Sequence, residues 1–240
     1  MKWFSNRFQR EGAGRPAPST GWPRAGVMAM THFWKLVAVN LLFVVFSLPV
    51  FTLPAALTAL NRVCVIIYKE GNIFLFTEFW KEFKRSFWRT MLPALGFGVL
   101  LFGGYFFMSL ANGNLQLGFV AVVFFALGML MVAVAVLVGE YFFVIIAVLD
   151  ISVVNGLKNA FLLSISKPVY SIGTLLLVAF LAVALAALMP FIGSVLLVLI
   201  WVSLTQYPIC FMVYDITEDL VLIPYENQKQ AQASEDSDNT

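Results

Sequence analysis

The sequence predicts an all-α, polytopic membrane protein with six transmembrane helices, short interfacial cytoplasmic helices and both termini in the cytoplasm. Of its 240 residues, 61% are hydrophobic and only 12% are charged, and the mean hydropathy is +0.89. A soluble domain carries about 25% charged residues and about 45–50% apolar residues. The composition therefore excludes an ordinary soluble enzyme, a disordered chain and a nucleic-acid-binding protein.

Six apolar segments are candidates for the spans, because a helix that crosses a hydrocarbon layer ~30 Å thick needs about 20 mostly apolar residues. The second segment is the shortest and contains Asn61 and Arg62. The fourth would rise about 48 Å as one helix, so we expect it to tilt, to kink or to extend beyond the membrane, with the change at Gly139-Glu140. The six segments are 28–48, 54–68, 91–111, 117–148, 168–189 and 192–214.

The distribution of charge predicts the orientation of these spans. The connections at 49–53, 112–116 and 190–191 contain no charged residue, whereas the segments on the opposite side contain nearly all of them. Lysine and arginine are enriched on the cytoplasmic side of membrane proteins. We therefore expect both termini and both charged loops to lie in the cytoplasm, and the protein to reside in the cell membrane.

This orientation divides the chain into three parts. Residues 1–27 form a basic cytoplasmic N-terminal segment, and residues 28–214 form the membrane domain, which includes a cytoplasmic segment at 150–167. Residues 215–240 form an acidic cytoplasmic tail, predicted to be disordered from about residue 226 because it contains few apolar residues.

Between the second and third spans, residues 77–90 are predicted to form an amphipathic helix. One face is aromatic and the other is charged, which is typical of a helix that lies in the headgroup layer with its aromatic face in the acyl boundary. The alternative is that this face docks on a partner protein. The defining residues are Phe76, Phe79, Trp80, Phe83, Lys84, Arg85, Phe87 and Arg89.

Polar side chains inside the spans are the best candidates for function, because the hydrocarbon layer makes them costly. Arg62 has one counter-ion within the spans, Glu140. We weigh a buried Arg62–Glu140 ion pair against an Arg62 that reaches the inner headgroups while Glu140 lies at the inner interface. Asparagine amides in spans usually hydrogen-bond neighbouring helices. The candidate intramembrane cluster is Arg62, Glu140, Asn40, Asn61 and Gln206.

Two patterns repeat after the fourth and sixth spans, Leu149-Asp150-Ile151-Ser152 and Tyr214-Asp215-Ile216-Thr217. In each, an aspartate at the membrane exit is followed by a serine or threonine that is suited to cap a short helix.

The usual signatures of catalysis and of metal binding are absent from the sequence. It contains no Walker A loop, no His-Glu-x-x-His motif and no paired intramembrane aspartates. Cys64 and Cys210 lie in apolar runs and are expected to be buried free thiols, and the glycine-rich stretch 96–104 is expected to serve helix packing. We therefore expect no enzyme activity, no catalytic or metal site, no cofactor and no nucleic-acid partner.

Several short motifs resemble those of the YesL-like family of bacterial membrane proteins. They include Asn40-Leu41-Leu42, Ser47-Leu48-Pro49, Asp150 and Leu157-Lys158-Asn159-Ala160, and they extend over about residues 33–215. The resemblance implies a polytopic membrane protein of no established activity. Members of that family tend to be encoded near carbohydrate ABC-transport and sugar-utilisation genes in Gram-positive bacteria.

Two functional hypotheses follow. The first is a non-enzymatic accessory or assembly factor linked to carbohydrate uptake, which contacts the lipid bilayer and the subunits of a carbohydrate ABC transporter. The alternative is a small secondary transporter or channel, in which the five intramembrane polar residues line one cavity.

Overall fold

The chain is helical throughout the residues that the computed structural model describes, which are 21–218 except 72, 115, 117 and most of 167–193. No strand occurs in this part of the chain. The elements are α1 (Gly21–Thr31), α2 (Phe33–Ser47), the 3-10 turn η2 (Val50–Thr52), α3 (Leu53–Lys69), α4 (Leu75–Gly113), α5 (Phe119–Val148), α6 (Val153–Ser166) and α8 (Ser194–Thr217).

Three stretches of the described chain are long and apolar enough to cross a membrane, namely Val50–Lys69, Leu75–Gly113 and Phe119–Val148. A fourth span is possible if α1 and α2 count as one broken helix. These helices indicate a membrane-spanning protein. The expected span at 168–189 and the expected tail beyond residue 218 lie largely outside the described residues.

The first expected span, 28–48, is not one helix. Pro23–Thr31 and Phe33–Ser47 meet at His32 with a bend of 78°. Two contacts hold the end of α3 at this bend. In the first, Lys35 Nζ donates to the Gly71 carbonyl at 2.5 Å. In the second, Gly71 packs against His32 so closely that an added Cβ would lie 2.5 Å from the imidazole ring, and the φ of Gly71 is +72°. Only glycine fits this position comfortably.

The predicted helix at 77–90 and the predicted span at 91–111 form one continuous helix, α4. Pro93 lies inside α4 rather than at its boundary. In an apolar environment, ending the helix would leave several backbone groups without hydrogen bonds. This costs more free energy than the single hydrogen bond that proline removes. Hydroxyl groups on the preceding turns also bond to the backbone, from Ser86 to the Glu82 carbonyl and from Thr90 to the Ser86 carbonyl.

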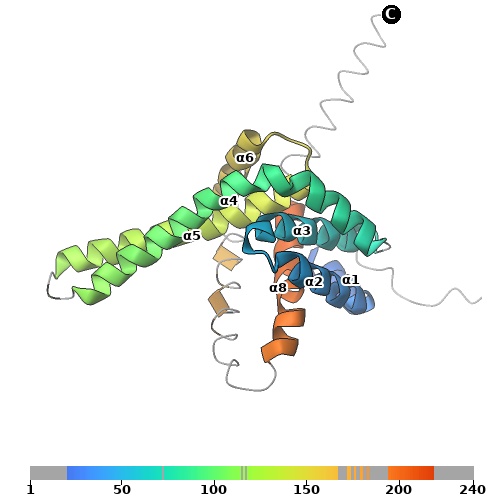
Figure 1. The fold of residues 1–240 in the computed structure, drawn as a ribbon, viewed down its shortest axis with the longest axis horizontal. Coiled ribbons are helices and arrows are strands. Elements are labelled where there is room, and N and C mark those ends of the chain that lie inside the picture. Colours follow the sequence, from blue (N-terminus) through green and yellow to red (C-terminus); the bar gives the residue numbers. More distant parts are fainter. Residues whose placement is uncertain are drawn as a thin grey trace, which may run out of the picture.

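Helices α4 and α5 form a long antiparallel pair that extends away from α1, α2, α3 and α8 (Figure 1). The pair is closely packed at Gly104 and Gly128, where a Cβ added to Gly104 would lie 2.8 Å from the Gly128 carbonyl oxygen. Helix α5 continues unbroken through Gly139, so the expected change at Gly139-Glu140 does not interrupt it. The apolar stretches of both helices are mostly exposed, as expected for surfaces that face lipid.

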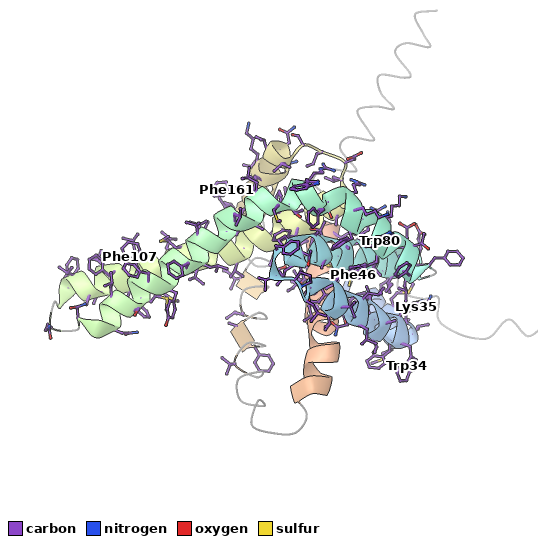
Figure 2. The ribbon with its side chains drawn as sticks, viewed as in Figure 1. Trp34, Lys35, Phe46, Trp80, Phe107 and Phe161 are labelled. Carbon is purple, nitrogen blue, oxygen red and sulfur yellow. The ribbon has the colours of Figure 1, made fainter. Side chains whose placement is uncertain are left out.

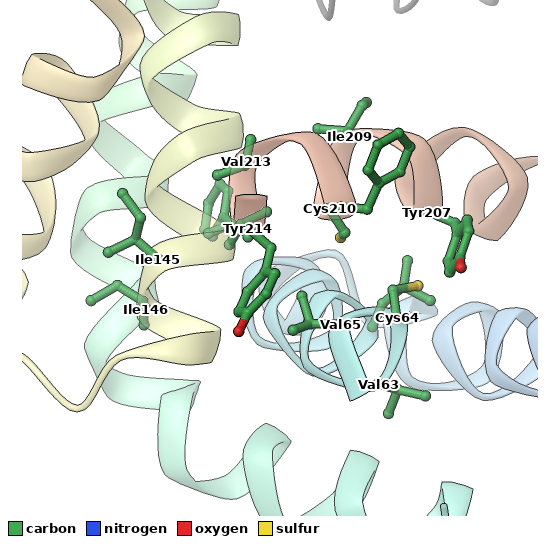
Figure 3. Packing of buried hydrophobic residues seen from close by; sticks show 14 of the residues in the cluster. Val63, Cys64, Val65, Ile145, Ile146, Tyr207, Ile209, Cys210, Val213 and Tyr214 are labelled. Carbon is green, nitrogen blue, oxygen red and sulfur yellow. The ribbon is translucent and has the colours of Figure 1, made fainter. Parts of the chain in front are cut away.

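The core lies where α3 meets α8 and the second half of α5. Figure 3 shows Cys64 and Val65 of α3 opposite Cys210 and Tyr214 of α8. Both cysteines are buried free thiols, as predicted. In Figure 1, α8 runs across the direction of the α4–α5 pair, while α6 packs on the opposite side of that pair. The position of α8 decides which intramembrane polar residues meet.

Candidate functional site

Hydrogen bonds join α8 to three other helices. In each case the partner on the other helix is a residue of the predicted intramembrane cluster. Asn40 of α2 is fully buried, and its Oδ1 accepts the backbone N–H of Ser203 at 2.9 Å. Asn61 of α3 is also fully buried, and its Oδ1 accepts a hydrogen bond from Cys210 Sγ at 3.3 Å. Both amides therefore attach α8 to its neighbours, the structural role that asparagine commonly has in membrane helices.

The third contact links α5 to α8. Gln206 Nε2 donates to Glu140 Oε2 at 2.8 Å, and Gln206 is 5% exposed. Gln206 precedes Pro208, which removes one backbone hydrogen bond of α8. The amide therefore supplies a polar contact between helices close to the point where the backbone of α8 is weakened.

Arg62 does not join this group. Its Nη1 donates to the Ala147 carbonyl at 3.1 Å, and within the described residues it forms no ion pair with Glu140. Successive residues of an α-helix are about 100° apart around its axis. Because Asn61 faces α8, Arg62 points instead toward α4 and the end of α5. Of the two alternatives weighed for Arg62 and Glu140, the buried ion pair is absent, and each residue makes a separate contact.

The aromatic face of 77–90 is packed inside the chain, which corrects the expectation that it lies in the acyl boundary. The ring of Phe46 on α2 lies 5.5 Å from Phe79, 5.3 Å from Trp80 and 5.2 Å from Phe83, measured between centroids. Figure 2 shows Phe46 and Trp80 together where α2 meets the first turns of α4. Phe79 is fully buried and Phe83 is 9% exposed. Only part of the face reaches the surface, with Phe76 57% exposed.

The charged face of the same stretch binds the start of α6, forming what we call the α4 clamp (Arg85, Arg89 and Asp150). Arg85 Nη2 and Arg89 Nη1 each lie 3.2 Å from Asp150 Oδ1, and Arg89 also donates to the Ile151 carbonyl. Asp150 is 82% exposed at its side chain, so solvent weakens these ion pairs. The clamp fixes the direction in which the chain leaves α5.

A buried carboxylate that sequence reasoning missed lies beside the clamp. Glu82 is 4% exposed, and its Oε2 is 3.6 Å from Arg85 Nη1, whereas its Oε1 has no hydrogen-bond partner among the described residues. Its position on the charged face of an amphipathic helix gave no signal of burial. Burial follows from the packing of α4 on α3, which brings Glu82 toward Arg62.

The two repeated patterns have different roles. Ser152 caps α6, because its hydroxyl accepts the Asn155 N–H at 3.4 Å, as predicted. Thr217 donates to the Val213 carbonyl within α8, and the short helix that it was expected to cap lies outside the described residues. Asp215 accepts the Tyr68 hydroxyl at 2.9 Å, a contact that nothing in the local pattern indicated.

Basic residues of the N-terminal helices hold the C-terminal end of α3. Arg24 donates from Nε to the Tyr68 carbonyl at 3.2 Å and from Nη2 to the Lys69 carbonyl at 2.6 Å. The last carbonyls of a helix lack partners within the helix and carry partial negative charge. Basic residues counted in the sequence as orientation signals therefore also have a structural role.

Residues 36–110 match a family model described as a protein of unknown function, DUF624. The match covers the region from α2 to most of α4, which includes Asn40, Phe46 and Glu82. YesL-like proteins belong to DUF624, so the match agrees with the resemblance at the level of this wider family. No curated protein and no solved structure matches the chain.

Two residues that carry the family resemblance make structural contacts. Asn40 binds α8, and the Pro49 carbonyl accepts the Thr52 hydroxyl at 2.6 Å in the turn before α3. Among the described residues, no group of three histidine, cysteine, aspartate or glutamate side chains is placed to hold a metal ion. The contacts connect helices, and none of them by itself assigns a reaction.

Proposed function

We propose that this protein is a non-enzymatic accessory or assembly factor of the cell membrane, with six spans and both termini in the cytoplasm. Its partners are the subunits of a carbohydrate ABC transporter. The observation that carries the proposal is that the polar residues within the apolar helices are used in contacts between helices. Asn40, Asn61 and the Glu140–Gln206 pair all join α8 to another helix, and among the described residues only the Asn61 Nδ2 of this group is a buried atom without a partner.

The outer face of α6 supports a docking role. Four of its apolar side chains are more than half exposed, although α6 packs its opposite face on α5 through Gly156 and Ala160. Figure 2 labels one of the exposed residues, Phe161. Exposed aromatic and aliphatic side chains beside charged residues are typical of interaction surfaces. The exposed set is Val154, Phe161, Leu162 and Ile165.

The link to carbohydrate uptake comes from the resemblance to YesL-like proteins, whose genes tend to lie near sugar-transport genes. The charge distribution supports the placement of α6 and the α4 clamp on the cytoplasmic side. There they would meet the cytoplasmic surface of a permease and its ATP-hydrolysing subunits.

The experiment is complementation of a strain that lacks the gene, measured as uptake of a panel of labelled sugars. We expect deletion of the gene to reduce uptake of a particular sugar. The variant Glu140→Leu/Gln206→Leu should restore this uptake, because replacing both members of a hydrogen-bonded pair preserves packing. The variant Phe161→Ser/Ile165→Ser should insert normally but fail to restore uptake, whereas Lys158→Gln on the same helix should restore it. The opposite pattern, with the interior variant inactive and the surface variant active, would contradict the proposal.

A second candidate, a small secondary transporter or channel, is favoured by one observation. Arg62 lines a polar cavity of about 320 Å³ between α3 and α4. The other four polar residues do not line this cavity. If the protein itself moves a solute through this region, Arg62→Ala should abolish uptake by purified protein in liposomes, without any partner.

A further inference from the structure

A groove of about 320 Å³ lies between α3 and the start of α4, and it contains charges of both signs. On α3, Arg62 and Glu70 lie two turns apart on one face. On α4, Glu78 and Lys81 lie one turn apart on the facing side. Ile66 and Phe74 complete the lining between them.

These four charges are not neutralised by one another. Within the described part of the chain, no ion pair of 4.0 Å or less joins any two of them. Arg62 donates one hydrogen bond, to Ala147, and a guanidinium carries five N–H donors. Buried Glu82 lies near Arg62, and the groove still presents guanidinium and ammonium donors and carboxylate acceptors that no ion pair within the groove uses.

A second, apolar groove of about 520 Å³ is lined in part by Leu75 and Phe76 of the same turn of α4. It runs between α2 and the first residues of α4, and it is lined by Leu41, Val45 and Phe76 among others. Phe74, which lines the polar groove, is 85% exposed. Residues 74–78, at the start of α4, thus contribute both to a charged recess and to an apolar recess, where the chain turns between α3 and α4.

We propose that these two grooves bind one phospholipid of the phosphoethanolamine class. The phosphate lies against Arg62 and Lys81, the ammonium donates to the carboxylates of Glu70 and Glu78, and one acyl chain occupies the apolar groove. Bonds between charged donors and charged acceptors are the strong class of hydrogen bond. A choline headgroup has no N–H to donate, and a glycerol headgroup has no cation. Neither headgroup can therefore form charged hydrogen bonds with the carboxylates of Glu70 and Glu78. This site is independent of the accessory role proposed above.

The test uses the full-length protein purified in detergent and titrated with phosphatidylethanolamine, phosphatidylcholine or phosphatidylglycerol, with bound lipid counted by native mass spectrometry. We expect phosphatidylethanolamine to bind at least about tenfold more tightly than either alternative. Soluble glycerophosphoethanolamine, which has the headgroup without acyl chains, should bind much more weakly. Equal binding of the three lipids, or equal binding of the soluble headgroup, would overturn the proposal.

The matched variant is Glu78→Gln/Lys81→Gln, which leaves the net charge unchanged and removes one carboxylate and one ammonium from the groove. It should reduce the preference for phosphatidylethanolamine about tenfold, while Lys158→Gln on the exposed face of α6 should not change it. A double variant that keeps the full preference would place the lipid elsewhere and overturn the assignment. Thermal unfolding of the lipid-free variant checks that the substitutions leave the fold intact.

Discussion

Alanine at Gly104 is expected to destabilise the protein, because Gly104 packs directly against the backbone of α5. A Cβ there would lie 2.8 Å from the Gly128 carbonyl oxygen and 2.7 Å from a methyl group of Val132. The carbonyl cannot move without separating the two helices. Overpacking of this kind costs about 1–3 kcal/mol.

Gly98, six residues earlier on the same helix, is the matched control. A Cβ added at Gly98 meets nothing within 4 Å, so Gly98→Ala should stabilise the helix by about 0.5–1 kcal/mol through the loss of glycine flexibility. The two variants should therefore differ by about 2 kcal/mol or more after this gain is included.

Thermal unfolding in nanodiscs, followed by tryptophan fluorescence, measures this difference. A chain of this size shifts its Tm by about 2–4 °C per kcal/mol, so Gly104→Ala should unfold at least about 4 °C below Gly98→Ala. If both variants shift the Tm equally and in the same direction, α4 and α5 do not pack through these glycines. Gly128→Ala should reproduce the effect of Gly104→Ala, because its Cβ would lie 2.6 Å from the Gly104 carbonyl oxygen.

Three further predictions concern the contacts between helices. Phe46→Ala should lower the free energy of unfolding by about 2–3 kcal/mol, whereas Phe76→Ala, at an exposed ring, should lower it by less than about 1 kcal/mol; equal effects in chemical unfolding would refute the role of Phe46. Asp150→Asn should cost less than about 1 kcal/mol, and this cost should vanish at high salt. Gln206→Leu should destabilise by about 1–3 kcal/mol, because the Glu140 carboxyl loses its donor; a neutral effect in the same assay would show that the bond contributes nothing to stability.

Most of the apolar helices could be predicted from the sequence, because hydrophobic length is a direct consequence of the bilayer thickness. The expected span 54–68 corresponds to α3 at Leu53–Lys69, and 117–148 corresponds to α5 at Phe119–Val148. The bend at His32 could not be predicted, because it depends on Gly71 and Lys35 meeting across a distance of many residues.

The aromatic face of 77–90 shows why the candidate site was harder to predict than the helices. Spacing alone establishes that Phe79 and Phe83 share a face, but spacing is the same whether that face meets lipid, a partner or another helix of the chain. The deciding residue, Phe46, lies in a different span. The choice between the two alternatives for Arg62 and Glu140 was open for a similar reason. A helix places Asn61 and Arg62 on different faces, and α8 occupies only one of them.

We propose above that the outer face of α6 docks on a carbohydrate ABC transporter. The most direct test replaces Phe161 with the photo-crosslinking residue p-benzoyl-phenylalanine, irradiates intact cells and identifies the products by mass spectrometry, with the same replacement at exposed Phe106 on α4 as the control. We predict crosslinks from position 161 to a subunit of a carbohydrate ABC transporter and none of these from position 106. Crosslinks from position 161 only to lipid, or only to a second copy of this chain, would contradict the claim.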